Sequence, residues 1–128
     1  MQGTQITVVG NLGSNVEIKD KKVNGQSVAT VRVAETPSYY DKQRGEWVEA
    51  PTNWWTVEVW GEMADNAAAS LAKGSAVLVV GNATTQEWTD KQSGEKRSRM
   101  VLRASAIGPN LARATAQVVK TGQSGPQY

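Results

Sequence analysis

The sequence contains no cysteine, no histidine and no phenylalanine among its 128 residues. Without cysteine there can be no disulfide, no thiolate metal site and no thiol nucleophile. Without histidine the chain lacks the commonest general base and the commonest metal ligand. The H-E-x-x-H, G-x-S-x-G and phosphate-loop patterns are also missing. We therefore expect no enzyme, no catalytic residue, no metal and no cofactor.

Long apolar runs are missing as well. The sequence has no stretch of about 18 apolar residues, and its N-terminus does not place basic residues before an apolar segment. It predicts neither a membrane span nor a secretory signal, so a cytoplasmic protein is the default expectation. With 39% apolar and 20% charged residues, a chain of this length suits one packed domain.

Charge is distributed unevenly behind a net value of +2. All 12 acidic residues lie at or before Glu95. Such segregation indicates a polyanionic partner or a solvated tail. The cations that follow Glu95 are Lys96, Arg97, Arg99, Arg103, Arg113 and Lys120.

Three of the five tryptophans lie within one short segment, NWWTVEVWG. Successive side chains of a β-strand point to opposite faces. One face here would carry Trp55 and two valines, which is an ordinary core face. The other would carry Thr56 and Glu58, which indicate solvent, with Trp54 and Trp60 at its two ends. The pattern predicts two exposed indoles, unless another element or an oligomer interface covers them.

The remaining sequence predicts five or six strands around one short helix. EMADNAAASLAKG favours a helix that ends at Gly74. DKQRG and TDKQSGEKRSR predict the tips of two extended hairpins. This order favours an all-β fold, an OB-fold five-stranded Greek-key barrel with long hairpin loops, because no crossover helices separate the strands. Residues 110–119 fit either helix or strand. The predicted strands are 5–10, 14–19, 28–36, 54–60, 76–88 and 99–107.

Each predicted hairpin combines aromatic side chains with positive charge. Single-stranded nucleic acid needs both, since its bases stack on aromatic rings for about 1–3 kcal/mol each and its phosphates need cations. The helix carries Glu62 and Asp65 and is a poor reader of duplex grooves. We expect sequence-tolerant binding of single-stranded DNA. An OB-fold RNA-binding protein and a carbohydrate-binding module are the alternatives.

The sequence resembles bacterial single-stranded-DNA-binding proteins along residues 4–109. The matching pieces are VVGNLG, NWWTVEVWG, LAKGSAVLVVG and WTDKQSGEKR, and the alanine-rich helix with GPNLARAT resembles the actinobacterial branch. The resemblance implies an OB-fold protomer that assembles into a homotetramer. It also implies that the protein protects single-stranded DNA in replication, recombination or repair, in the nucleoid-associated part of the cytoplasm.

Matched motif to motif, the stacking positions of that family fall on Tyr39, Trp54, Trp60 and Trp88, with Tyr40 as the neighbouring alternative to Tyr39. We expect Trp55 to face the core or an assembly surface, and Trp47 to be structural. Lys73 sits at the predicted helix C-terminus, where it could instead complement the helix dipole. The cations expected to contact phosphates are Lys42, Lys73, Arg97 and Arg99.

The sequence departs from the family at two places. Many members carry a long tail whose acidic, apolar end recruits repair and replication enzymes, whereas this sequence ends in GPQY, which indicates a truncated chain or a tail-less paralogue that lacks this route. Trp55 stands where a histidine is often found near the assembly surface. The expected divisions are an OB-fold single-stranded-DNA-binding domain at 1–109, an assembly-associated extension at 110–120 and a disordered tail at 121–128.

Overall fold

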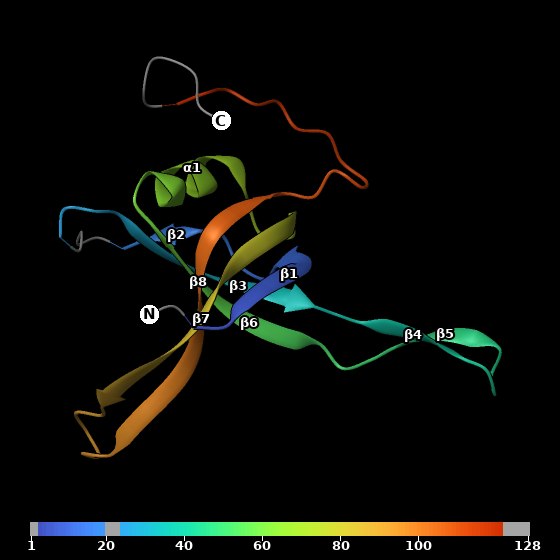
Figure 1. Ribbon diagram of the computed structural model, residues 1–128, viewed down its shortest axis with the longest axis horizontal. Coiled ribbons are helices and arrows are strands. Elements are labelled where there is room, and N and C mark those ends of the chain that lie inside the picture. The colour runs from blue at the N-terminus through green and yellow to red at the C-terminus, as the bar shows by residue number, and fades with distance from the viewer. Residues whose placement is uncertain (1–2, 20–23, 122–128) are drawn as a thin grey trace.

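The computed structural model describes residues 3–19 and 24–121. Within these residues the chain forms eight strands and one helix (Figure 1). In chain order they are β1 (Gln5–Leu12), β2 (Glu17–Ile18), β3 (Val28–Glu35), β4 (Ser38–Asp41), β5 (Glu46–Glu49), β6 (Asn53–Trp60), α1 (Glu62–Ser70), β7 (Ala76–Thr89) and β8 (Lys96–Pro109).

Five of these strands close into a barrel. The sheet runs β1-β7-β8-β6-β3, and β3 pairs back to β1 through Asn11 opposite Ala34 and Leu12 opposite Val33. All neighbours are antiparallel except β6 and β8, which run parallel. This closed five-stranded Greek-key arrangement confirms the predicted OB fold.

The barrel interior is filled mainly by valines, whose branched side chains suit strands. Val57 and Val79 are fully buried, as is Ala64 on the inner side of α1. Small alanines on that side let the helix lie close against one end of the barrel, as Figure 1 shows. The single helix therefore caps the core and leaves the outer sheet surface free for side chains of β3, β6, β7 and β8.

The predicted helix end at Gly74 is wrong. The helix stops at Ser70, and Leu71 is already extended with φ −119° and ψ 148°. This conformation lets Leu71 point into the core, where it is buried. A turn follows, in which Ser75 Oγ accepts the Ala72 N–H, and Gly74 there has a φ of 92°.

The predicted strand at 14–19 shrinks to the two residues of β2. Gly13 N–H donates to the Arg32 carbonyl, and Ser14 Oγ accepts the Arg32 N–H at 3.4 Å. These bonds turn the chain against β3 before β2 begins. The other predicted strands agree with the structure within a few residues, and β8 is longer at both ends than the predicted 99–107.

Two hairpins project from the barrel (Figure 1). The first, which we call the β4–β5 arm (residues 38–49), is a separate two-stranded sheet. The second, which we call the β7–β8 arm (residues 84–101), continues two barrel strands that are 14 residues long each. Both hairpin tips lie where the sequence predicts them.

Residues 110–121 form neither the helix nor the strand that the sequence left open. They run back over α1 in Figure 1, and Thr121 Oγ1 donates to Asn66 Oδ1 at 3.3 Å. The rest of the predicted tail, residues 122–128, lies outside the described residues. Within the described residues, no helix is long and apolar enough to cross a membrane.

Candidate nucleic-acid interface

Strand β6 sorts the tryptophans as its alternation predicts. Trp54 points outward and is 54% exposed. Trp55 points the other way, packs against the core and donates its indole N–H to Glu35 Oε1 at 3.4 Å. Trp60 is half-buried, which makes it less exposed than the sequence indicated.

An arginine from the neighbouring strand lies over Trp54. The Arg32 guanidinium carbon is 5.0 Å from the centre of the indole. Gly13 lies against the same ring, because a Cβ at that position would come within 2.5 Å of Trp54 Cζ3. A larger residue at position 13 would therefore displace the Trp54 ring or the local backbone.

Trp60 has a similar partner and a further anchor. The Arg103 guanidinium carbon lies 4.6 Å from the indole centre. The indole N–H donates to Glu58 Oε1 at 2.7 Å, and Glu58 Oε2 accepts from Gln86 Nε2 at 3.1 Å. The prediction that Glu58 faces solvent is wrong, since it is 8% exposed. Its position on the strand is outward, but Trp60 and Gln86 fold against its carboxylate.

Trp88 lies on the β7–β8 arm and is 45% exposed. The Arg99 guanidinium carbon is 5.9 Å from its ring centre. Arg99 is held there by Gln86, whose Oε1 accepts from both Nε and Nη2 at 3.4 Å each. A shallow hollow lined by Gln86, Glu87, Trp88 and Arg99 opens at this place.

Three of the five tryptophans therefore share one arrangement, an arginine over the indole. We call these the arginine–tryptophan pairs: Arg32 with Trp54, Arg103 with Trp60, and Arg99 with Trp88. The guanidinium is attracted to the indole face and still has N–H groups to offer a phosphate. An indole presents a flat π-surface on which a base can stack.

The sequence predicts Arg99 as a site residue but does not single out Arg32 or Arg103. Arg32 lies opposite Thr56 across β3 and β6, so it is the diagonal neighbour of Trp54. Arg103 lies opposite Glu58 in the parallel pairing of β6 and β8. Alternation in β3 puts Arg32 outside, but these strands are far apart in sequence, and only their register reveals the pairs.

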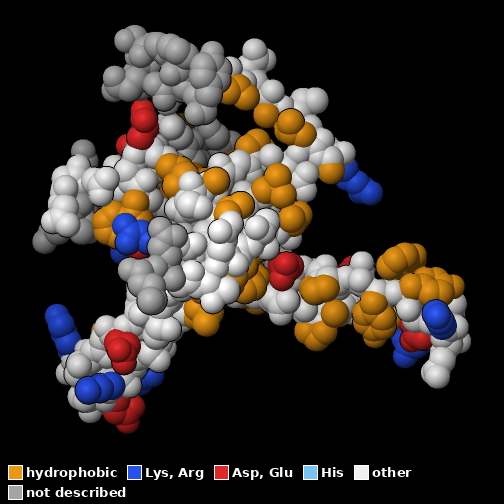
Figure 2. Space-filling view, in the orientation of Figure 1, with side chains coloured by type: hydrophobic (Ala, Val, Ile, Leu, Met, Phe, Trp, Pro, Cys, Tyr) orange, Lys and Arg blue, Asp and Glu red, His pale blue; other side chains and the backbone are white. Residues whose placement is uncertain are grey.

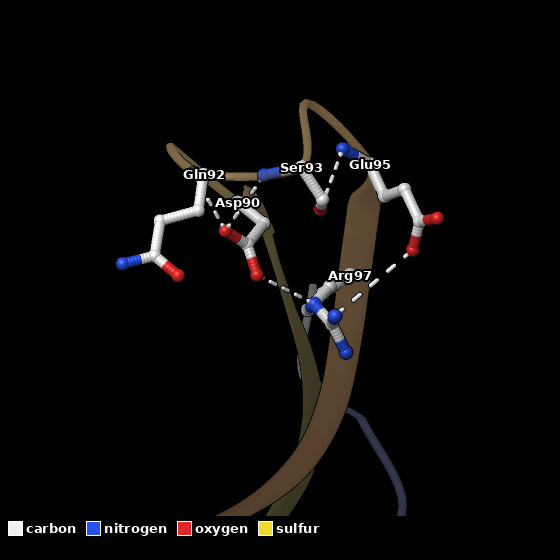
Figure 3. A network of polar contacts seen from close by, with 5 residues as sticks. All are labelled: Asp90, Gln92, Ser93, Glu95 and Arg97. Carbon is white, nitrogen blue, oxygen red and sulfur yellow. Dashed lines mark hydrogen bonds and ion pairs between the residues drawn. The ribbon is translucent and has the colours of Figure 1, made fainter.

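Arg97, a predicted phosphate contact, is already occupied by acidic side chains (Figure 3). Its Nε donates to Asp90 Oδ2 at 3.0 Å, and its Nη2 lies 4.0 Å from Glu95 Oε2. The pKa of Asp90 is lowered, first by the N–H groups of Gln92 and Ser93 and then by Arg97. Much of the charge of Arg97 is thus compensated within the turn.

The two predicted lysines lie at separate places. Lys42 is exposed at the tip of the β4–β5 arm. Lys73 lies beyond the last turn of α1, so the structure does not support its alternative role at the helix dipole. Its N–H donates to Asn15 Oδ1 at 2.8 Å, and the adjacent Gly74 N–H donates to the Leu12 carbonyl. These bonds bring Lys73 to the segment that contacts Trp54.

The β4–β5 arm carries aromatic side chains on both faces, and Figure 2 shows hydrophobic side chains along it with cations near its tip. Tyr40 and Trp47 pack edge to face, with ring centres 5.7 Å apart. Trp47 is 71% exposed, so its contact is confined to the arm. Tyr39 lies on the opposite face, across from Val48. Tyr39 thus lies on the separate β4–β5 sheet, apart from the three tryptophans that lie beside arginines.

Metal ligands do not gather anywhere in residues 3–19 and 24–121, since no group of three or more acidic side chains could hold an ion there. The candidate interface consists of aromatic rings and guanidinium groups. It offers stacking and phosphate contacts.

The chain is also similar in sequence to known proteins. The model of the single-strand binding protein family matches residues 4–110. A single-stranded DNA-binding protein from Mycolicibacterium smegmatis is 39% identical over 122 residues, which are 95% of this chain and 73% of that protein. Another, from Paenarthrobacter nicotinovorans, is 38% identical over 97% of this chain and 72% of its own length.

A solved structure is similar as well. The crystal structure of a small single-stranded DNA-binding protein from Streptomyces coelicolor superposes with a TM-score of 0.72 at 31% identity. The match covers 89% of this chain and all of the other. The similarity therefore extends beyond the sequence motifs to the barrel and its connections.

Proposed function

This chain belongs to the single-strand binding protein family, and we propose that it binds single-stranded DNA, without sequence preference and without catalysis, on its arginine–tryptophan pairs. The observation that carries this proposal is the repetition of one arrangement. Trp54, Trp60 and Trp88 each have an arginine 4.6 to 5.9 Å from the ring centre.

Each pair supplies the two interactions that a single strand requires. A base stacks on the indole for about 1–3 kcal/mol, whatever its identity, because every base has a π-face. The base uses the part of the indole surface that the guanidinium leaves open, and the guanidinium contacts the neighbouring phosphate through its N–H groups. OB folds bind oligonucleotides on the second and third barrel strands, which are β3 and β6 here.

Other predicted residues extend this surface. Lys73 lies beside the segment that contacts Trp54 and adds a cation there. Tyr39 and Lys42 on the β4–β5 arm offer an outlying aromatic and an outlying charge. Arg97 contributes less than Arg99, because it is held by Asp90.

We also propose that the protein acts as a homotetramer, in DNA replication, recombination or repair, in the cytoplasm near the nucleoid. The family resemblance supports this assembly. On the outer face of the barrel, Val9 and Leu78 lie opposite each other and are 50% and 41% exposed. Self-association would cover such side chains. Sedimentation of a stable monomer at micromolar concentration would contradict the tetramer.

Tryptophan fluorescence titrated with oligo-dT at two salt concentrations tests the binding function. We expect quenching on binding, and weaker binding at the higher salt. Trp54→Ala should weaken binding by about 1–3 kcal/mol and leave the fold intact. Unchanged emission at saturating oligo-dT would contradict the proposal. Preference for oligo-rU, or binding of a soluble glucan that ignores salt, would instead support the RNA or carbohydrate alternative.

A further inference from the structure

A carboxylate lies buried within the surface that is proposed to bind a polyanion. Glu58 is 8% exposed and sits on the outward side of β6, between the positions of Trp54 and Trp60. A negative charge here repels nearby phosphates and weakens DNA binding. Its presence calls for a compensating role.

Both oxygens of Glu58 hold groups of the interface. Oε1 accepts the Trp60 indole N–H at 2.7 Å, and Oε2 accepts from Gln86 Nε2 at 3.1 Å. Gln86 Oε1 then accepts from Arg99, which lies over Trp88. A continuous chain of contacts thus runs from one arginine–tryptophan pair to the next, across β6, β7 and β8.

Glu58 determines which group donates and which accepts in each of these hydrogen bonds. A carboxylate can only accept hydrogen bonds, so it must face the amide nitrogen of Gln86. The amide oxygen of Gln86 is then left for Arg99, which can only donate. An amide at position 58 has a nitrogen of its own, which would meet a donor from Trp60 or Gln86. If Gln86 turned to relieve that clash, its nitrogen would face Arg99.

We infer that Glu58 is a positioning residue for DNA binding, which fixes the Trp60 indole directly and the Arg99–Trp88 pair through Gln86. The inference rests on the proposed function. It makes Trp60 and Trp88 one coupled site. Trp54 has its contacts elsewhere, with Arg32 and Gly13.

Glu58→Gln tests the inference, because loss of the charge and loss of the positioning contacts change the affinity for oligo-dT in opposite directions. Loss of a negative charge alone would tighten binding to oligo-dT. Loss of the fixed geometry should weaken it by about tenfold, on the scale of a hydrogen bond to a charged group. Fluorescence anisotropy of labelled oligo-dT at one fixed salt concentration measures the change. Binding that is unchanged or tighter would overturn the inference.

Glu35→Gln is the matched control. Glu35 also accepts an indole N–H, from Trp55, but that indole faces the core side of β6. The substitution removes the same charge and should leave binding unchanged or slightly tighter. Equal weakening in both variants would overturn the inference, because a general loss of packing would then explain both.

A double-mutant cycle separates positioning from a purely structural role. Trp60→Ala and Trp88→Ala should be non-additive in the wild-type background by at least about twofold. The Gln86→Met background keeps Glu58 but removes the side chain that connects it to Arg99. In this background the non-additivity of the two tryptophan substitutions should be smaller. Coupling of equal size in both backgrounds would show that Trp60 and Trp88 are not linked through Glu58 and Gln86, and would overturn the inference.

If Glu58→Gln fails to fold, the double-mutant cycle in the Gln86→Met background still tests the inference. Failure of wild-type protein to bind oligo-dT would overturn the proposed function together with this inference. Wild-type binding with equal affinity in Glu58→Gln would overturn only the inference.

Discussion

The two arms end in the same turn but join the barrel differently. Their tips read DKQRG (41–45) and DKQSG (90–94). In each, the aspartate Oδ1 accepts two backbone N–H groups, at 2.9 and 3.3 Å in the first and at 2.8 and 3.3 Å in the second. In each, an arginine Nε approaches the aspartate Oδ2, at 3.7 Å for Arg44 and 3.0 Å for Arg97.

The strands behind these turns are unlike. Those of the β4–β5 arm have four residues each and form a sheet of their own, in which Tyr40 and Trp47 contact each other. Those of the β7–β8 arm are continuous with the barrel, and Gln86 ties the arm to Glu58 of β6. The turn sequence thus sets the tip, while strand length and side-chain contacts decide whether an aromatic ring is held relative to the barrel.

The largest expected difference lies between Trp88→Ala and Trp47→Ala. Trp88 is held beside Arg99 and joined to the barrel, so its loss should weaken oligo-dT binding by about 1–3 kcal/mol. Trp47 has its ring contact within the arm, and its loss should cost less than half as much. Fluorescence anisotropy of labelled oligo-dT gives both values. Equal losses would show that attachment to the barrel does not matter.

A smaller difference is expected between the arginines of the β7–β8 arm. Arg99→Ala removes a guanidinium that lies over Trp88 and should flatten the salt dependence by about 0.7 of a slope unit, the value for one phosphate of a single strand. Arg97→Ala should change the slope by less, because Asp90 already compensates its charge. Affinities measured over a series of salt concentrations check this. A larger effect of Arg97 would mean that DNA displaces Asp90.

Replacing the glycine of either turn with alanine should strain the turn by a similar amount, but the effect on the melting temperature should differ. Gly45 and Gly94 have φ values of 67° and 74°, and alanine costs about 1 kcal/mol or more in this region. Gly94→Ala should lower the melting temperature more than Gly45→Ala, since the β7–β8 strands belong to the barrel. Thermal unfolding followed by circular dichroism measures both melting temperatures. Equal shifts in the two variants would contradict this expectation.

The smallest effect concerns acid. The pKa of Asp90 is lowered by the N–H groups of Gln92 and Ser93 and by Arg97, so its turn contacts stabilise the arm above the ordinary aspartate pKa of 3.8. They should be lost as the pH falls through the lowered pKa. An NMR titration of the Asp90 carboxyl carbon measures this, and a midpoint above 3.8 would contradict the contacts.

Much of the fold could be predicted from the sequence, because alternation and turn residues are local signals. The valines of β6 had to face a core, and Trp54 had to face away from it. The helix end could not be predicted, because Leu71 extends to reach the core while a glycine that resembles a stop lies further on.

The candidate site was predicted less completely, because it depends on register. Arg32 and Arg103 meet their tryptophans across strands that are distant in sequence. Glu58 looked solvated because its strand position is outward, yet two side chains from β6 and β7 cover it. The roles of all site residues remain predictions.

Base stacking on the arginine–tryptophan pairs can be tested by following the indole N–H signals of the five tryptophans by NMR while oligo-dT is added. We expect the signals of Trp54, Trp60 and Trp88 to move at saturation. The signal of Trp55, which faces the core side of β6 and donates to Glu35, should stay in place. If the signals of Trp54, Trp60 and Trp88 stayed in place at saturation, whether or not that of Trp55 moved, base stacking on the arginine–tryptophan pairs would be contradicted.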